Sequence, residues 1–249
     1  DGFHCPMADQ LMGATAENLA DEFSIDRQEQ DAYAVESQQR CQRARQEGRF
    51  REEIAAVEIP GRKGVTVVDT DEHPRDGATI EGLARLKPVF KSGGSVHAGN
   101  SSGITDGACA LVIADEELAR SEGWPILATL GASARAGVEP QRMGIGPVPA
   151  IRKLLEKTGQ KIEDFDLVEL NEAFAAQVIA CLRELPIDSQ RLNVNGGSIA
   201  LGHPIGATGA RITTTLLHEL RRRGGGKGLA TLCISGGMGL ALEIDVHGS

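Results

Sequence analysis

The sequence predicts an α/β fold in which helices pack on a buried sheet, and three observations support this prediction. Strand-like and helix-like segments alternate along the second half of the chain. The core must be aliphatic, because only 3% of the 249 residues are aromatic while 41% are hydrophobic. Glycines and prolines mark the ends of the expected elements.

The first hundred residues are polar and irregular, and few regular elements are expected there. Ser24 is a plausible N-cap for a helix that ends at Gly48. The alternating segment 54–59 predicts a strand. Glycines then punctuate the chain as far as Gly103, so this part is expected to be an elaborate loop region.

The pattern changes near Ile126, where the regular alternation begins. Pro147 or Pro149 suits the first turn of a helix, and Gly159 suits its end. The expected strands span 126–134, 167–170, 229–234 and 240–246, and the expected helices span 147–158, 173–185 and 207–223. A short glycine turn joins the last two strands, so the sheet should end in an antiparallel hairpin.

Charge and cysteine content exclude several classes of function. The formal net charge of −9 argues against nucleic acid as the main partner, because phosphate binding needs a basic surface. The 5 cysteines are irregularly spaced and contain no CxxC pair, so neither a zinc site nor a disulfide framework is predicted, and no metal is expected. A reducing compartment such as the cytoplasm fits best. No segment is long and apolar enough to span a membrane.

Three segments that follow expected strands carry candidate chemistry, at 171–175, 193–211 and 233–239. A histidine in a glycine-rich loop, such as His203, can be held rigidly and can exchange protons near neutral pH. Each candidate also has an ordinary explanation: Asn171 as a helix N-cap, His203 as a hydrogen-bonded turn residue, and Cys233 as a core cysteine. Because these strands are expected to end at the same edge of a sheet, the three side chains should lie close together.

The three segments resemble the C-terminal active-site blocks of the thiolase family. They contain Asn-Glu-Ala-Phe-Ala, the run from Asn-Val-Asn-Gly-Gly through Gly-His-Pro to Gly-Ala-Arg, and Cys-Ile-Ser-Gly-Gly-Met-Gly. Segments 12–18 and 98–108 resemble that family too, in the same order along the chain. The resemblance implies a thiolase-like layered fold, consisting of the C-terminal half and the loop domain, with a mixed five-stranded sheet and helices on both faces.

The resemblance also implies a domain division. Residues 1–105 would form the loop domain that binds coenzyme A, 106–126 the last strand and helix of the N-terminal domain, and 127–249 the C-terminal domain. The family's nucleophilic cysteine lies in a glycine-rich elbow of the N-terminal half, and no cysteine here has that context. The chain also begins at Asp1 without an initiator methionine or a signal peptide. We therefore expect the nucleophile-bearing half to be missing from this chain and to be its partner, and organellar targeting stays open.

The resemblance implies roles for five residues. His203 would activate the nucleophile, and Cys233 would be the second acid/base, a role that a lowered thiol pKa favours. Asn171 would position a water that, with His203, binds the thioester oxygen. The backbone of Ser235 and Gly236 would form a second oxyanion site, although many family members have glycine in place of Ser235.

Coenzyme A and acyl-CoA would be substrates, with no tightly bound cofactor. The residues expected to line their site are Met12, Arg75, Phe90, Ala98, Ser102, Met143 and Phe174. Arg75 would face the nucleotide end, where a guanidinium suits phosphate or stacks on adenine. The ordinary alternatives are core positions for the methionines and phenylalanines and a solvated surface charge for Arg75.

The implied function is acyl-CoA C-acetyltransferase activity, which condenses acyl-CoA or cleaves 3-ketoacyl-CoA through an acyl-cysteine. Leu11 stands where biosynthetic members often have histidine, so the subtype stays open, as does acyl chain length. The alternative is a catalytically inert CoA-binding fragment or module, because no nucleophile is recognised in the chain. A homodimer or homotetramer is expected, together with an apolar surface that a partner covers.

Overall fold

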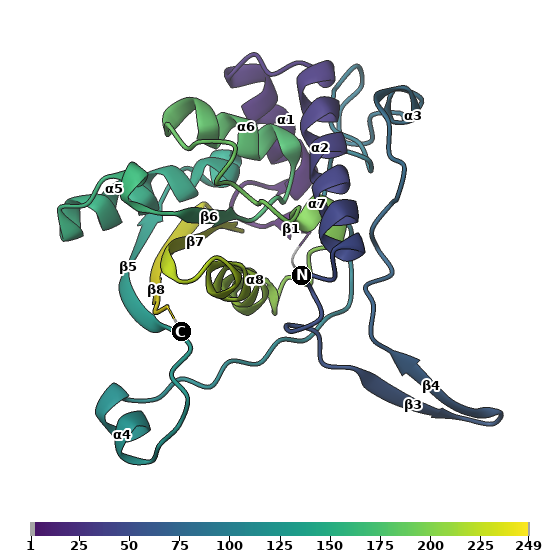
Figure 1. Ribbon diagram of the computed structural model, residues 1–249. Coiled ribbons are helices and arrows are strands. Elements are labelled where there is room, and N and C mark those ends of the chain that lie inside the picture. The colour runs from purple at the N-terminus through teal and green to yellow at the C-terminus, as the bar shows by residue number, and fades with distance from the viewer. Residues whose placement is uncertain (1–2, 249) are drawn as a thin grey trace.

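The computed structural model describes residues 3–248 and builds them around a four-stranded mixed sheet with the strand order β5-β8-β7-β6 (Figure 1). The strands are β5 (Thr129–Gly137), β6 (Leu167–Leu170), β7 (Gly226–Ile234) and β8 (Met238–Val246). Strand β6 runs parallel to β7, whereas β8 is antiparallel to both β7 and β5. The predicted α/β class and the closing hairpin are therefore confirmed.

The expected count of five strands is wrong for the described residues. Beyond β6, the neighbouring segment makes a single parallel bridge, between Val168 and Leu192. The Val168 N–H donates to Arg191 O, and the Asn193 N–H donates to Val168 O. Asn193 then has a φ of +43°, a left-handed conformation that ends an extended segment. One residue pair thus stands where a fifth strand was expected.

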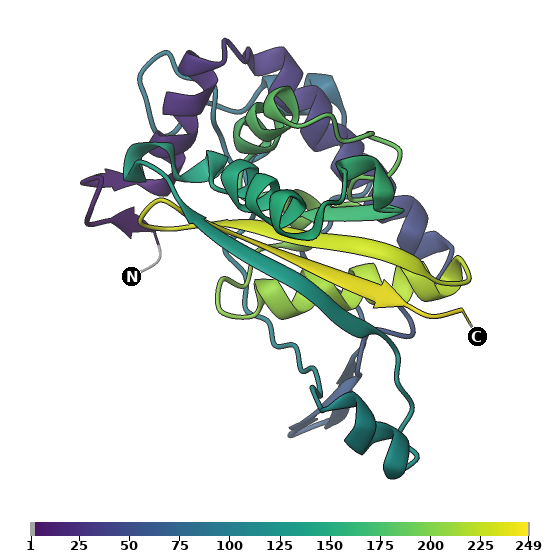
Figure 2. The ribbon, with the colours of Figure 1, turned by 90° about the vertical axis from the view of Figure 1, so that its left-hand side faces the viewer.

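Helices cover both faces of the sheet, as Figure 2 shows. Helix α5 (Pro147–Thr158) packs on β5 and β8, and α8 (Thr208–Arg222) packs on the opposite face against β6 and β7. Ile151 and Leu154 of α5 are fully buried, as are Leu216 and Leu220 of α8. Helix α5 has the bounds that the sequence predicts, because Gly159 ends it in the left-handed conformation, at a φ of 70°.

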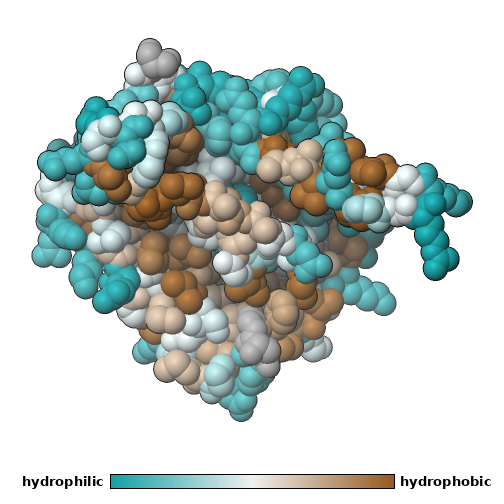
Figure 3. Space-filling view, turned by 90° about the horizontal axis from the view of Figure 1, so that it is seen from below, coloured by the Kyte–Doolittle hydropathy of each residue, from teal (hydrophilic) through white to brown (hydrophobic). Residues whose placement is uncertain are grey.

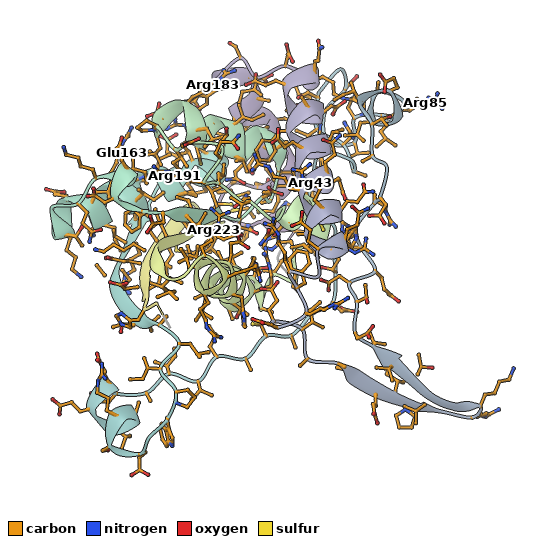
Figure 4. All side chains as sticks on the ribbon, viewed as in Figure 1. Arg43, Arg85, Glu163, Arg183, Arg191 and Arg223 are labelled. Atoms are coloured by element: carbon orange, nitrogen blue, oxygen red, sulfur yellow. The ribbon has the colours of Figure 1, made fainter. Side chains whose placement is uncertain are left out.

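A further layer joins the first part of the chain to the second. Helices α1 (Met12–Glu22) and α2 (Arg27–Gln46) pack on α6 (Ala175–Glu184), and α2 also contacts α7 (Ser198–Leu201). Arg183 of α6, labelled in Figure 4, donates to Glu29 of α2 over 2.8 Å. The expected N-cap Ser24 is wrong: Asp26 caps α2 by accepting from the Glu29 N–H, while Ser24 has a φ of +51°.

The remaining elements are short and lie at the edges of the body. They are β1 (His4–Cys5), β2 (Gln10–Leu11), β3 (Val57–Gly61), β4 (Gly64–Val68), α3 (Ile80–Ala84), α4 (Glu116–Ser121), and the 3-10 helices η1 (Pro140–Ile145) and η2 (Ile162–Asp164). The expected strand at 54–59 thus starts three residues later and pairs with β4 as a hairpin. The hairpin and α4 both project from the body (Figure 1).

The segment 104–115 is extended and pairs with no strand in the described structure. Its apolar side chains face solvent: Val112 is 94% exposed, Ile104 78% and Ile113 71%. Hydrophobic residues also gather on the underside of the molecule (Figure 3). Among residues 3–248, no helix combines the length and apolar character needed to cross a bilayer.

Two glycines bring the start of α5 into direct backbone contact with the start of β8. A Cβ placed on Gly239 would lie 2.0 Å from the Gly146 carbonyl oxygen. A Cβ on Gly146 would lie 2.3 Å from the Met238 carbonyl oxygen. No side chain fits between the two segments, and this contact fixes the β7–β8 turn beside the cavity described next.

Candidate active site

One cavity of about 830 Å³ lies where β7 ends, between the sheet and the segments of the first half. This cavity is lined by all seven residues that were expected to line a coenzyme A site, namely Met12, Arg75, Phe90, Ala98, Ser102, Met143 and Phe174. His203, Cys233 and Ser235 line it too. Asn171 and Gly236 are not among its lining residues.

His203 is held by hydrogen bonds on both its backbone and its ring. Its N–H donates to Gly103 O over 3.1 Å, and its Nδ1 lies 2.6 Å from Thr208 Oγ1. The Thr208 hydroxyl has one proton, which it donates to the Pro204 carbonyl over 3.0 Å, and in that arrangement it accepts from the ring. The ring proton then lies on Nδ1 and a lone pair on Nε2, but a hydroxyl can rotate, so this bond alone does not fix the tautomer.

The charge state of His203 follows from its surroundings. Burial, and then the positive charge of Arg211, lower the pKa of His203 to about 4. The imidazole is therefore neutral near neutral pH, and its Nε2 is free to take a proton from a nearby group.

Asn171 follows β6 directly and is 1% exposed. Its Nδ2 lies 3.5 Å from His203 Nε2, and its Oδ1 accepts from the Ser198 hydroxyl over 2.6 Å. The alternative that Asn171 caps the next helix does not hold, because α6 begins after Phe174 without a side-chain cap. The amide is instead directed at the histidine.

Glu172 was not singled out from the sequence, yet it organises the back of the site. Its carboxylate accepts from the Tyr33 hydroxyl at 2.9 Å and the Ser37 hydroxyl at 2.7 Å, both on α2. It also accepts from Asn193 Nδ2 at 3.0 Å and the Ile199 N–H at 3.1 Å. One buried carboxylate thus ties α2, the glycine-rich segment and α7 to the residue beside Asn171. Its only sequence signal is a charged residue at the end of a buried strand.

Cys233 lies near the end of β7, opposite Gly239 in the hairpin. Burial raises the pKa of the Cys233 thiol to about 12, and its own backbone N–H opposes this only weakly. This differs from the expected lowering, because no cationic side chain acts on the sulfur among the causes of the shift. Cys233 is thus a protonated thiol near neutral pH.

The turn after Cys233 faces a second thiol. The pKa of Cys5 is lowered: burial raises it, but the N–H groups of Ala8, Met7 and Gly236 and the Ser235 side chain together outweigh burial. Gly236, at a φ of 87°, therefore directs its N–H to Cys5, while Ser235 lines the cavity. Ser235 and Gly236 therefore both interact with Cys5, and their expected joint role at an oxyanion site stays a prediction.

Part of the cavity wall is an apolar cluster to which Cys233 also belongs. The Phe90 and Phe174 rings meet edge to face, with centroids 6.2 Å apart and planes at 89°. Met12 and Met143 pack in the same cluster. Among the described residues, no group of three or more histidine, cysteine or acidic side chains is arranged to hold a metal ion.

Two family models match this chain. A model described as the N-terminal domain of thiolase matches residues 1–117, and one described as the C-terminal domain of thiolase matches residues 124–246. The expected absence of the N-terminal domain is therefore wrong. The alternative of a catalytically inert module rested on that absence and loses its support.

Individual proteins and structures agree with these matches. The chain is 54% identical over 245 residues to an acetyl-CoA acetyltransferase of Pseudomonas aeruginosa, which covers 98% of this chain and 62% of that protein. It is 54% identical over 236 residues to a β-ketoadipyl-CoA thiolase of the same organism, covering 94% and 59%. The crystal structure of the Bacillus anthracis acetyl-CoA acetyltransferase superposes with a TM-score of 0.95 at 49% identity, covering 98% and 62%.

The structure of human mitochondrial 3-ketoacyl-CoA thiolase in complex with CoA superposes with a TM-score of 0.90 at 43% identity, covering 98% of this chain and 61% of that one. The chain thus spans about three-fifths of the length of the relatives that it matches.

Proposed function

Because this chain belongs to the thiolase family, we propose that it transfers acyl groups between coenzyme A thioesters and forms or breaks a carbon–carbon bond in doing so. One observation carries the proposal: His203 and Cys233 face a single cavity, and Asn171 reaches His203 from behind. A base, an acid and an amide donor therefore surround one point in space.

In the proposed first half-reaction, His203 Nε2 takes the proton of a cysteine thiol. The thiolate attacks the thioester carbonyl, the carbon–sulfur bond to coenzyme A breaks, and the acyl group stays on the cysteine while coenzyme A leaves as the thiol. His203 and a water held by Asn171 donate to the thioester oxygen where negative charge develops. Preorganised donors of this kind are each worth about 3 kcal/mol of barrier lowering.

In the second half-reaction Cys233 moves a proton at the α-carbon. For synthesis, the Cys233 thiolate removes that proton from acetyl-CoA and becomes the thiol, and the carbanion attacks the acyl-cysteine, which expels the cysteine thiolate and gives 3-ketoacyl-CoA. For cleavage, the protonated Cys233 returns the proton to the departing acetyl-CoA carbanion. The empty site already holds Cys233 in the form that cleavage requires, since its pKa is raised to about 12.

The cavity suits a coenzyme A thioester. Its volume of about 830 Å³ lies within the range of roughly 300–1,000 Å³ that small-molecule sites occupy. Phe90, Phe174 and Met143 offer an apolar wall to the pantetheine arm, and Arg75 offers a cation to a phosphate. A relative named for β-ketoadipyl-CoA is as similar as one named for acetyl-CoA, so the proposal leaves the acyl group open.

The test compares thiolysis of acetoacetyl-CoA with exchange of labelled coenzyme A into acetyl-CoA. His203→Ala should lower both rates by at least 10²-fold, the usual effect of losing a general base. Cys233→Ala should abolish thiolysis but spare much of the exchange. Cys109→Ala is the matched control, because Cys109 contacts Thr214 and does not line the cavity. Wild-type rates in His203→Ala, or equal losses of both reactions in Cys233→Ala, would refute these roles.

A further inference from the structure

A continuous chain of hydrogen bonds runs behind the cavity from α8 to His203. Arg211 Nη2 donates to Ser198 Oγ over 2.9 Å, and the Ser198 hydroxyl donates to Asn171 Oδ1 over 2.6 Å. Asn171 Nδ2 then faces His203 Nε2 at 3.5 Å. The family motifs drew attention to Asn171 and His203, while Ser198 and Arg211 received no role.

Arg211 determines which group donates and which accepts in each of these hydrogen bonds. A guanidinium only donates, whereas a hydroxyl and an amide can each be turned either way. Because Ser198 Oγ accepts from Arg211, its own proton is available for Asn171 Oδ1. The carbonyl side of the amide is thereby engaged, so that the NH₂ side points at the histidine. The histidine in turn offers a lone pair on Nε2 and keeps its proton on Nδ1, opposite Thr208.

The position of Arg211 is energetically unfavourable. Its side chain is only 19% exposed, and its Nε and Nη1 have no hydrogen-bond partner among the described residues. Nη1 lies 3.9 Å from Glu169 Oε2, beyond hydrogen-bond distance. Burying a cation with two unpaired N–H donors costs free energy of folding. We take this cost as a sign that the one hydrogen bond of Arg211, to Ser198, has a function.

We propose that Arg211 and Ser198 are positioning residues that set the direction of hydrogen bonding at the active site. Arg211 acts through Ser198 to hold the Asn171 amide in one orientation, and so holds His203 as the Nδ1–H tautomer with its lone pair on Nε2, the atom that faces the amide. The catalytic meaning of this arrangement rests on the proposed function. The orientation itself is a property of the folded chain and can be measured without any turnover.

The experiment records ¹⁵N NMR spectra of histidine-labelled protein across pH 3.5–8, with His203 assigned by its loss in His203→Ala. Ring nitrogen shifts report the tautomer, and their titration reports the pKa. The wild type should show His203 as a single Nδ1–H tautomer. Ser198→Ala frees the amide to turn, so both tautomers should appear, while the His203 pKa stays low because burial and the charge of Arg211 both remain.

Arg211→Met should change both quantities. The Ser198 hydroxyl can then reverse, which mixes the tautomers, and loss of the cation should move the His203 pKa from about 4 toward its ordinary value of 6.5. Arg211→Lys keeps a charged, donor-only group and should preserve both the low pKa and most of the Nδ1–H form. Arg222→Met is the matched control on the same helix, since Arg222 pairs with Glu219 and Arg49 O instead.

Two results would overturn the proposal: an Nε2–H tautomer in the wild type, or an unmixed tautomer in Ser198→Ala. If Arg211→Met does not fold, Ser198→Ala and Arg211→Lys decide the question. The outcome is separable from that of the proposed function. If the tautomer pattern is as predicted but the protein transfers no acyl group, the positioning roles stand and the proposed activity is refuted. If the protein is active but lacks the pattern, the activity stands and the positioning roles are refuted.

Discussion

Burial controls the protonation of individual side chains at this site more strongly than neighbouring charges do. His203 is kept neutral and Cys233 is kept as a thiol by desolvation in each case. Glu169, one residue before the end of β6, follows the same rule. Burial raises its pKa to about 8, and the attraction of Arg211 only partly opposes this.

The raised pKa of Glu169 predicts a specific dependence of stability on pH. A carboxyl whose folded pKa exceeds its unfolded value of 4.5 stabilises the protein fully below pH 4.5, and this contribution is lost as pH rises through 8. Glu169→Gln removes that ionisation. Relative to wild type, its free energy of unfolding should therefore rise by a few kcal/mol between pH 5 and pH 8.5.

Urea unfolding at the two pH values measures this difference. Glu163→Gln, on the outer surface (Figure 4), is the control and should follow the wild type. A stability difference between Glu169→Gln and wild type that does not change with pH would show that Glu169 is ionised in the folded state.

The candidate site was only partly predictable at this scale. Asn171, His203 and Cys233 stand in motifs that can be recognised locally. Glu172 could not be assigned a role, because its partner Tyr33 lies 139 positions away. Ser198 and Arg211 stand within a recognised motif, but the motif does not show that their side chains meet each other and Asn171. Hydrogen bonds between distant segments leave no periodic signal, so only the folded chain reveals them.

Individual elements were predictable where proline or glycine residues mark their ends. Helix α5 begins at a proline and ends before a left-handed glycine, and its bounds match the prediction. Helix α1 has no side-chain cap and was not predicted. In place of a fifth strand there is a single bridge followed by a positive φ at Asn193, a conformation that asparagine adopts more readily than most residues but that its sequence position does not predict.

Two glycines at element ends should respond very differently to the same substitution. Gly159→Ala places a Cβ in open space, so only the left-handed backbone is strained, at about 1–2 kcal/mol. Gly239→Ala drives a Cβ to within 2.0 Å of the Gly146 carbonyl, and the backbone must move. We expect a loss above about 3 kcal/mol there, with a weaker site, because the β7–β8 turn follows Cys233.

Thermal and urea unfolding of the two variants gives the comparison. Binding of coenzyme A, followed by calorimetry, should weaken for Gly239→Ala and stay unchanged for Gly159→Ala. Equal stabilities for the two variants would mean that the α5 and β8 backbones can separate at little cost.

At the scale of the whole molecule, the body is held together by contacts between residues far apart in sequence. Helices α1 and α2 pack on α6, and Glu172 receives two hydrogen bonds from α2. The Ser102 N–H donates to Ala173 O, and the Ala175 N–H donates to Asn100 O. By contrast, α4 lies outside this packing (Figure 1), whereas segment 104–115 meets the body through Cys109, which contacts Thr214 of α8. The expected dimer or tetramer stays a prediction, for which the exposed Val112 and Ile113 are candidate contacts.

Helix α4 projects from the body and connects the first part of the chain to β5 (Figure 1). This position implies that the peptide link at α4 is dispensable once folding is complete. Trypsin should nick the chain near Arg120, in the exposed helix α4. The two fragments should still co-elute on gel filtration and separate only in denaturant, and coexpressed pieces ending and starting there should reconstitute the fold. Fragments that part under native conditions would contradict this. The same property makes the connection a suitable place to open the chain for circular permutation or to insert a reporter domain.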